Sequence, residues 1–220
     1  MAMLALVLYL AGLGTCFGVR TWWHYRTTGD SGFRRPAPDA GATARWGAVL
    51  FVAALIAGLV APVLGVLGIL DPWPALAARE VGWTGLAVAV VGFVATVGAQ
   101  AAMGSSWRIG VREAEETELV TTGVFRWSRN PIFAAMVVAV LGLTIAVPNV
   151  VQVVALVTLV VAVELQVRGV EEPYLLQRHG SSFAEYASRT GRFVPFVGRF
   201  PQVARTRSGV SAALSDGEEE

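Results

Sequence analysis

Long apolar runs alternate with short polar connections along this chain. Five runs are almost free of charged side chains, and they cover residues 1–19, 46–70, 83–103, 131–147 and 150–167. A helix that crosses about 30 Å of hydrocarbon needs roughly 20 apolar residues. The first three runs reach that length, and the last two lie near its lower limit. The pattern therefore predicts an all-α fold, a polytopic integral membrane helical bundle with five transmembrane helices in a single domain over residues 1–201.

The polar connections predict how these helices are joined and how the chain ends. Pro148-Asn149 leaves room only for a tight hairpin between the last two runs. Gly92 and Gly98, in the third run, are residues that let neighbouring membrane helices approach closely. Residues 168–190 carry apolar positions at roughly helical spacing among charges, which predicts an interfacial helix. Residues 202–220 are rich in Ser, Gly and Arg and end in three glutamates, so we expect a disordered tail.

Composition agrees with a membrane protein and excludes several other classes. The chain has 220 residues, of which 55% are hydrophobic and only 15% are charged, against about 25% charged in ordinary soluble domains. Its one cysteine, Cys16, allows no intrachain disulfide. His24 and His179 lie far apart without metal-ligand spacing, so no metal site is expected. The net charge of +1 says nothing by itself about nucleic acid, and no nucleic-acid partner is expected for this membrane protein.

The basic residues, which are all arginines, predict the orientation in the membrane. Sixteen of the seventeen lie in residues 20–45, 108–129 and 168–207, and Arg79 stands alone. In a five-helix bundle those three segments share one side. Because basic connections stay on the inner side of cell membranes, that side is expected to be cytoplasmic. We therefore expect a multi-pass protein of the cell membrane, with the N-terminus outside and the C-terminus in the cytoplasm.

Charged residues at the end of the last apolar run are the strongest indication of a site. Glu164, Arg168, Glu171 and Glu172 would share one face of a regular helix. A salt bridge between Glu164 and Arg168, which would fix the end of the helix, accounts for those two residues. It does not account for the adjacent carboxylates Glu171 and Glu172. Two carboxylates beside an arginine are better suited to receive a polar, partly cationic ligand.

An ordered set of short motifs covers roughly the C-terminal half of the chain. The pieces are Leu119–Phe125, Arg129–Phe133, Arg168–Leu175, Gly180–Tyr186 and Arg192–Pro195. In this order they resemble the isoprenylcysteine carboxyl methyltransferase family, to which phospholipid methyltransferases are related. The resemblance implies a membrane-embedded enzyme that transfers a methyl group from S-adenosyl-L-methionine to a lipophilic small molecule or lipid. It also implies that the cofactor-binding region lies at the cytoplasmic side.

The resemblance also assigns residues to that site. The cofactor would be held by Glu118, Leu119, Val120, Phe125, Arg129, Asn130, Pro131, Phe133, Glu171 and His179. The catalytic residues would be Arg168, as the anchor for an acceptor carboxylate, and Glu172. Glu164 would then orient Arg168. The identity of the acceptor and the oligomeric state stay open.

Two departures from the family pattern keep other functions in view. The family usually has His where Asn130 stands and Tyr where Phe133 stands. One alternative is an NADPH-dependent membrane reductase of the sterol-reductase type, which would use Arg126, Arg129 or Arg178 for a phosphate. The other is a non-catalytic lipid-binding membrane protein, which the two departures would favour if they abolish cofactor binding.

Overall fold

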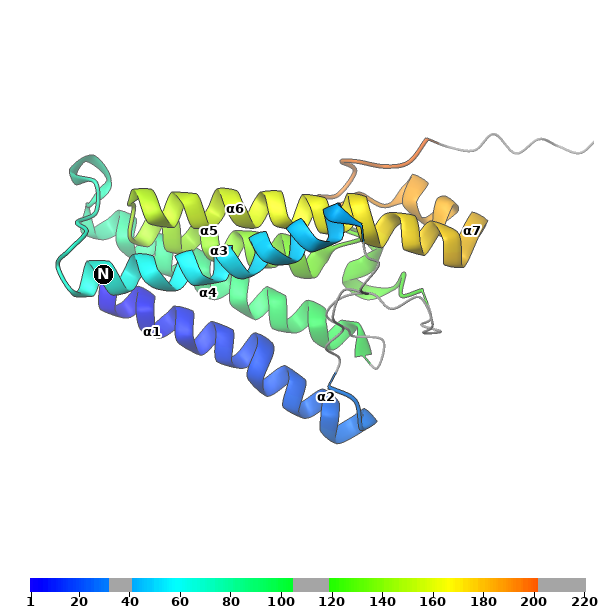
Figure 1. Ribbon diagram of the computed structural model, residues 1–220, viewed down its shortest axis with the longest axis horizontal. Helices are drawn as coiled ribbons and strands as arrows, with labels where there is room; N and C mark the ends of the chain where they lie inside the picture. The colour runs from blue at the N-terminus through cyan, green and yellow to red at the C-terminus, as the bar shows by residue number, and fades with distance from the viewer. Residues whose placement is uncertain (32–40, 105–118, 202–220) are drawn as a thin grey trace, which may run out of the picture.

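The computed structural model describes residues 1–31, 41–104 and 119–201, and the regular elements in these ranges are helical (Figure 1). The α-helices are α1 (Ala2–Leu13), α2 (Arg20–Thr28), α3 (Ala42–Val66), α4 (Arg79–Ala102), α5 (Pro131–Ala146), α6 (Val150–Gln166) and α7 (Glu172–Arg189). Two π-helical segments, η1 (Gly14–Val19) and η5 (Val167–Glu171), join α1 to α2 and α6 to α7. Two 3₁₀ turns are η2 (Pro74–Leu76) and η4 (Gly123–Arg126).

Four of the helices in the described ranges are long and apolar enough to cross a membrane. They are Ala2–Thr28, Ala42–Val66, Arg79–Ala102 and Val150–Arg189. The first is the continuous helix formed by α1, η1 and α2, and the last is the one formed by α6, η5 and α7. The predicted all-α membrane bundle is confirmed. The predicted count of five spans is not, because α5 has 16 residues and a length of about 24 Å. The helix from Val150 has 40 residues and a length of about 60 Å. Since α6 alone covers its apolar part, we place η5 and α7 beyond the hydrocarbon.

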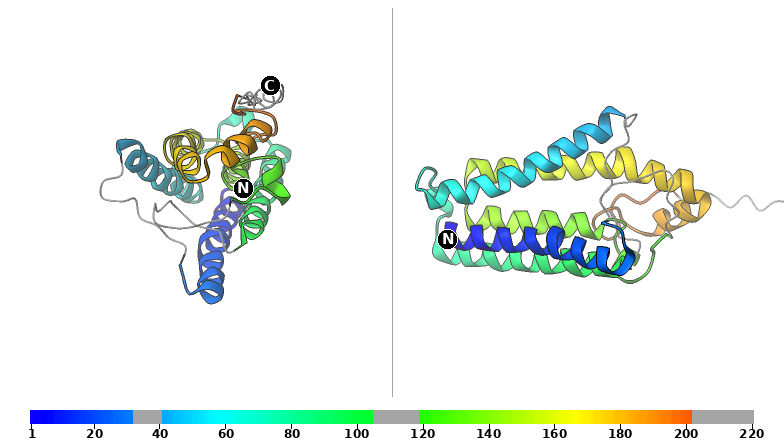
Figure 2. Two further views of the ribbon diagram at one scale, coloured as in Figure 1. Left: turned by 90° about the vertical axis from the view of Figure 1, so that its right-hand side faces the viewer. Right: turned by 60° about the horizontal axis from the view of Figure 1, so that its bottom comes forward.

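The helices run along the longest axis of the molecule, with α4 beside α5 and α3 beside α6 (Figures 1 and 2). One end of the bundle holds the N-terminus, η2 and the turn between α5 and α6. The opposite end holds α2, the start of α3, the end of α4, the turn η4, and η5 with α7. Apart from Arg79, the described arginines belong to the segments of this second end. The predicted grouping of the basic connections thus agrees with the fold, and the orientation relative to the cytoplasm stays a prediction.

Small residues bring α4 and α5 into unusually close contact. A Cβ added at Gly142 would lie 2.2 Å from the backbone nitrogen of Ala89. One added at Gly92 would lie 2.3 Å from the backbone nitrogen of Ala139. Ala89 and Ala139 are themselves fully buried. Because the two backbones touch here, the position of α5 depends on α4, and α5 carries the start of the candidate site.

The predicted hairpin between α5 and α6 is present and is held by Asn149. Its side-chain oxygen accepts a hydrogen bond from the backbone N–H of Gln152 at 2.9 Å, which caps the N-terminus of α6. Its Nδ2 donates to the carbonyl of Val147 at 3.1 Å. The backbone N–H of Trp73 donates to the carbonyl of Pro148 at 2.8 Å, which ties the neighbouring connection to the same turn.

The π-helical segment η5 changes which charged residues share a helix face. A regular helix would have kept Glu164, Arg168 and Glu172 together, and that expectation is wrong. A π turn closes its hydrogen bonds over one more residue than an α turn, so the residues after it are rotated about the axis. Arg168 forms the predicted ion pair with Glu164, and 61% of the Arg168 side chain is exposed. Glu172 instead points into the protein, where it is buried.

Candidate functional site

Arg129, immediately before α5, is a buried arginine whose guanidinium binds four acceptors. Its Nη2 donates to Oε1 of Glu172 at 2.5 Å and to the carbonyl of Gly198 at 3.0 Å. Its Nη1 donates to the carbonyls of Ala187 at 3.1 Å and Thr190 at 2.5 Å. These acceptors come from α7 and from the segment that follows it. Arg129 therefore fastens the start of α5 to the C-terminal region.

Glu172 is shared between two arginines. Arg192 donates from Nε to Oε1 and from Nη2 to Oε2, both at 2.8 Å, so this pair is bidentate. Burial by itself would raise the pKa of Glu172, but the hydrogen bonds and charges of Arg192 and Arg129 outweigh it and lower that pKa. Glu172 is therefore held as a carboxylate. We refer to Arg129, Glu172 and Arg192 as the arginine clamp.

Backbone contacts align the two segments that the arginine clamp joins. Ser128 and Gly191 form an isolated parallel bridge. The backbone N–H of Arg129 donates to the carbonyl of Gly191 at 2.8 Å. The carbonyl of Arg192 accepts from the backbone N–H of Asn130 at 3.0 Å and from its Nδ2 at 3.1 Å. Asn130 is the N-cap of α5, and Pro131 occupies the first turn, where the missing N–H of proline costs no hydrogen bond.

An aromatic cluster closes the other side of this region. Tyr186, in α7, donates its hydroxyl to the carbonyl of Phe125 at 2.6 Å, in the turn η4. Phe183 makes edge contacts with Tyr186 and with Phe200, at ring centroid distances of 6.4 and 5.9 Å. Leu119 packs against the same cluster. The 119–130 segment is thus anchored to α7 at two points, the aromatic cluster and the arginine clamp.

Glu171 differs sharply from its neighbour. It is half-buried, and among the described residues its carboxylate accepts a single long hydrogen bond, from Nε2 of Gln166 at 3.4 Å. No ion pair to Glu171 occurs within the part of the chain that the structure describes. Burial, opposed in part by the Gln166 hydrogen bond and aided by the charge of Glu172, raises the pKa of Glu171 to about 7. Glu171 is therefore a carboxylate with unused capacity to accept hydrogen bonds.

His179 lies one residue before a sharp kink in α7. Gly180 has φ 52° and ψ −124°, a conformation that glycine adopts readily and other residues do not. The Nε2 atom of His179 is buried without a hydrogen-bond partner among the described residues. The kink lets the second half of α7 turn its aromatic side chains inward.

The other predicted site residues divide into three groups. Val120, Pro131 and Phe133 are half-buried, and Phe133 packs against the core between α3, α5 and α6. Arg168 stays outside the arginine clamp, exposed and paired with Glu164. Glu118 lies outside the described residues, as does the expected tail 202–220.

Two residues of this region were not among the predicted site residues. Arg192 supplies one of the two arginines of the arginine clamp, and Tyr186 binds the backbone of η4. Both belong to motifs that the sequence contains, Arg192–Pro195 and Gly180–Tyr186. The motifs marked these residues, but nothing in the sequence spacing indicated that Glu172 and Phe125 are their partners.

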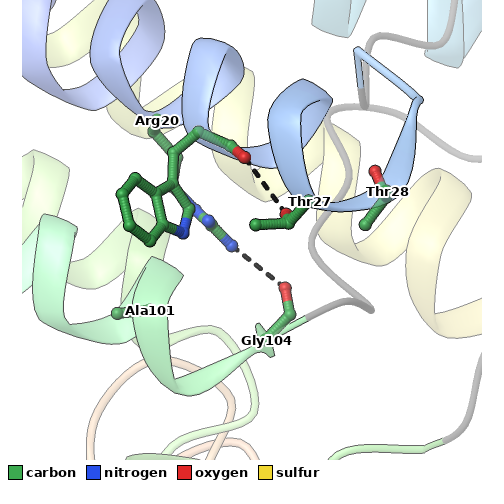
Figure 3. A pocket seen from close by; sticks show the side chains of 6 residues that line it. Arg20, Thr27, Thr28, Ala101 and Gly104 are labelled. Atoms are coloured by element: carbon green, nitrogen blue, oxygen red, sulfur yellow. Dashed lines mark hydrogen bonds between the residues drawn. The ribbon is translucent and has the colours of Figure 1, made fainter.

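A separate cavity of about 310 Å³ lies between α2 and the end of α4 (Figure 3). None of the predicted site residues lines it. Its lining residues are Arg20, Trp23, Thr27, Thr28, Ala101 and Gly104. Arg20 donates from Nη2 to the carbonyls of Gln100 at 3.2 Å and Gly104 at 3.0 Å. The positive charge of Arg20 is favourable at this position, because the C-terminus of helix α4 carries partial negative charge.

Comparison with known proteins bears on the same region. Residues 81–182, which run from α4 into α7, match the phospholipid methyltransferase family. A curated relative is the nickel-cobalt-cadmium resistance protein NccN of Alcaligenes xylosoxydans xylosoxydans, 30% identical over 131 residues. That match covers 59% of this chain and 55% of NccN, so the chain spans about half the length of the relative.

A solved structure shares the fold. It is the eukaryotic intramembrane Ras methyltransferase, isoprenylcysteine carboxyl methyltransferase, with a TM-score of 0.52 and 21% sequence identity. The superposition covers 88% of this chain and 70% of that one. The family match over the central region confirms the resemblance noted in the sequence, and the solved structure shows that the fold is shared.

Proposed function

We propose that this membrane protein is a methyltransferase that binds S-adenosyl-L-methionine and methylates a lipophilic acceptor. The family match and the shared fold support a membrane methyltransferase in general. The observation that carries the cofactor assignment is the state of Glu171. It is a half-buried carboxylate beside a fully paired one, with a single long hydrogen bond and a raised pKa.

The groups that S-adenosyl-L-methionine offers match what Glu171 lacks. The ribose hydroxyls and the amino group of the cofactor are hydrogen-bond donors, and the molecule carries positive charge. Such a ligand would compensate for the burial of the Glu171 carboxylate, since hydrogen bonds to ionised groups are the stronger ones. Glu172 has no comparable capacity, because both of its oxygens are bound by the arginine clamp. We therefore assign cofactor binding to Glu171. Glu172, expected to be catalytic, and Arg129, expected to bind the cofactor, are instead assigned to holding the site together through the arginine clamp.

The remaining contacts would come from the start of α5 and the turn η4. When bound, the cofactor supplies a methyl group already activated on a sulfonium centre. The protein then has mainly to align this group with the acceptor. Phe133 and Phe125 offer aromatic faces toward which a positive centre is attracted. The surrounding wall would be provided by Asn130, Pro131, Leu119 and Val120. His179 would contribute its Nε2, which has no hydrogen-bond partner among the described residues.

Arg168 is suited to the acceptor rather than to the cofactor. It is exposed, it is oriented by the carboxylate of Glu164, and its planar fork fits a carboxylate on a lipophilic molecule. Its position at the end of the apolar helix α6 would place such an acceptor at the membrane surface. In this proposal the arginine-rich end of the bundle faces the cytoplasm, in accord with the distribution of basic residues.

The reductase alternative receives less support from the contacts. A nicotinamide cofactor with a phosphate would need a basic side chain to bind it. Arg129, one of the three predicted candidates, already has its guanidinium engaged by four acceptors. The methyltransferase proposal needs no additional cation at this point.

Calorimetric titration of the detergent-solubilised protein tests the proposal. We expect S-adenosylhomocysteine to bind and NADPH not to bind. Glu171→Gln should weaken S-adenosylhomocysteine by about ten- to a hundredfold, which corresponds to about 1.5–3 kcal/mol for a hydrogen bond to a charged group. Glu185→Gln is the matched control, because Glu185 lies on α7 in an exposed pair with Arg189. Binding of NADPH alone, or equal affinities for the two variants, would overturn the assignment.

A further inference from the structure

We propose that Arg192 is a positioning residue for the cofactor site, acting through the arginine clamp. Its side chain holds the beginning of α7 through Glu172, and its backbone carbonyl holds the cap of α5 through Asn130. Arg192 thereby sets the distance between the two elements that carry the proposed cofactor ligands. The part of this inference that concerns the cofactor rests on the proposed function.

The electrostatics of the clamp make its three members interdependent. One carboxylate lies between two guanidinium groups, and the side chains of Arg129, Glu172 and Arg192 are only 3%, 9% and 16% exposed. If Arg192 lost its charge, Glu172 would keep only one hydrogen bond, from Arg129. Oε2 of Glu172 would then have no donor among the described residues. A buried polar atom that loses its hydrogen-bond partner costs free energy, which favours a rearrangement of the surrounding segments. The arrangement is therefore more stable when all three side chains are in place than when Arg192 is missing.

The clamp is coupled to the proposed ligands through covalent neighbours. Glu171 directly precedes Glu172 at the end of the π-helical segment η5, so fixing the side chain of Glu172 fixes the direction in which Glu171 projects. Asn130 directly follows Arg129, and its side-chain amide donates to the carbonyl of Arg192. Loosening the clamp therefore displaces a proposed ligand on each of its two sides.

The geometry also requires arginine rather than lysine at position 192. Nε and Nη2 bind the two oxygens of Glu172 side by side, both at 2.8 Å. Lysine has one ammonium group and cannot reproduce this two-point contact, although it keeps the charge. The conservative change is therefore expected to fall between the wild type and a neutral replacement.

The test uses the full chain in detergent with three variants. Arg192→Gln removes the charge, Arg192→Lys keeps it, and Arg189→Gln is the control, since Arg189 pairs with Glu185 on the exposed side of α7. Without ligand, hydrogen exchange should be at least tenfold faster at the amides of residues 129 and 130 in Arg192→Gln. Those amides donate to the carbonyls of Gly191 and Arg192 in the wild type. Arg192→Lys should be intermediate, and Arg189→Gln unchanged.

Affinity for S-adenosylhomocysteine then separates positioning from mere structural support. We expect Arg192→Gln to weaken binding at least tenfold at a temperature where every variant is fully folded. In a Glu171→Gln background the same change should weaken it by a smaller factor, because one of the two ligands through which Arg192 acts is already gone and only Asn130 remains. Arg192→Lys provides the same comparison if Arg192→Gln does not fold.

Each outcome decides one part of the inference. Unchanged hydrogen exchange at residues 129 and 130 in both Arg192 variants would show that Arg192 does not hold the two segments together. This outcome does not depend on whether the protein binds the cofactor. Faster exchange with unchanged affinity would make Arg192 a structural residue only. Equal losses of affinity with and without Glu171 would show that Arg192 does not act through that ligand. If the wild type binds no S-adenosylhomocysteine, the proposed function and the positioning role fail together, while the exchange measurement still decides the clamp.

Discussion

Replacing Gly142 by alanine should destabilise the bundle by an amount that the structure allows us to work out. The added Cβ would lie 2.2 Å from the backbone nitrogen of Ala89 and 2.7 Å from the carbonyl oxygen of Gly85, both in α4. These are backbone atoms, so no side-chain rotation can relieve the clash. Since carbon atoms pack at about 3.5–4.0 Å, α4 and α5 must separate by about 1 Å or more. The contact that positions the start of α5 would be lost with it.

The expected magnitude combines two opposing effects. Overpacking costs about 1–3 kcal/mol, and three contacts under 3 Å place this site at the upper end of that range. Alanine regains about 1 kcal/mol relative to glycine in helix propensity. The net loss is therefore about 2 kcal/mol, which lowers the melting temperature of a chain of this size by about 4–8 °C.

Gly98→Ala is the matched control for this measurement. Gly98 lies in α4, and a Cβ added there would meet nothing within 4 Å. The Gly98→Ala variant should lose no stability, and its free energy of unfolding should rise by up to about 1 kcal/mol from helix propensity. Thermal unfolding in detergent, followed by tryptophan fluorescence, compares the two variants directly. Melting temperatures that agree within 1 °C would refute the close packing of α4 on α5.

Three further predictions concern the candidate site. Gly180→Ala should cost about 1–3 kcal/mol of unfolding free energy, because alanine is strained at φ 52°, and Ser181→Ala is its control in thermal unfolding. Tyr186→Phe should cost about 1–3 kcal/mol by leaving the carbonyl of Phe125 unpaired, and hydrogen exchange should speed up in residues 119–127. The pKa of Glu171 is raised from 4.5 to about 7 in the folded protein, so its ionisation becomes a cost to stability as pH rises through this range. A ligand that needs the carboxylate should therefore bind about tenfold more tightly at pH 8 than at pH 6, and calorimetry on Glu171→Gln should show no such dependence.

The sequence by itself determined the parts of the structure in which the interacting groups are close neighbours along the chain. Apolar run length predicted the helical membrane bundle, and α3, α4 and α6 each extend over most of a predicted run. Pro131 opens α5 and Asn149 turns the hairpin because both act on backbone groups within a few residues. Glu164 and Arg168 pair because four residues make one turn of a regular helix. The run 131–147 also formed a helix, α5, although one too short to count as a spanning helix by length.

Tertiary structure decided the features that depend on distant partners. Sequence spacing alone could not distinguish Gly92, which touches the backbone of α5, from Gly98, which faces open space. Nor could it show that a π turn would rotate Glu172 away from Arg168 and toward Arg129 and Arg192, which lie 43 and 20 residues from it along the chain. A carboxylate in a sequence is equally able to bind a ligand or a structural arginine. Which of the two it binds is settled by what the fold places within hydrogen-bonding distance, and for Glu171 and Glu172 the fold placed different neighbours there.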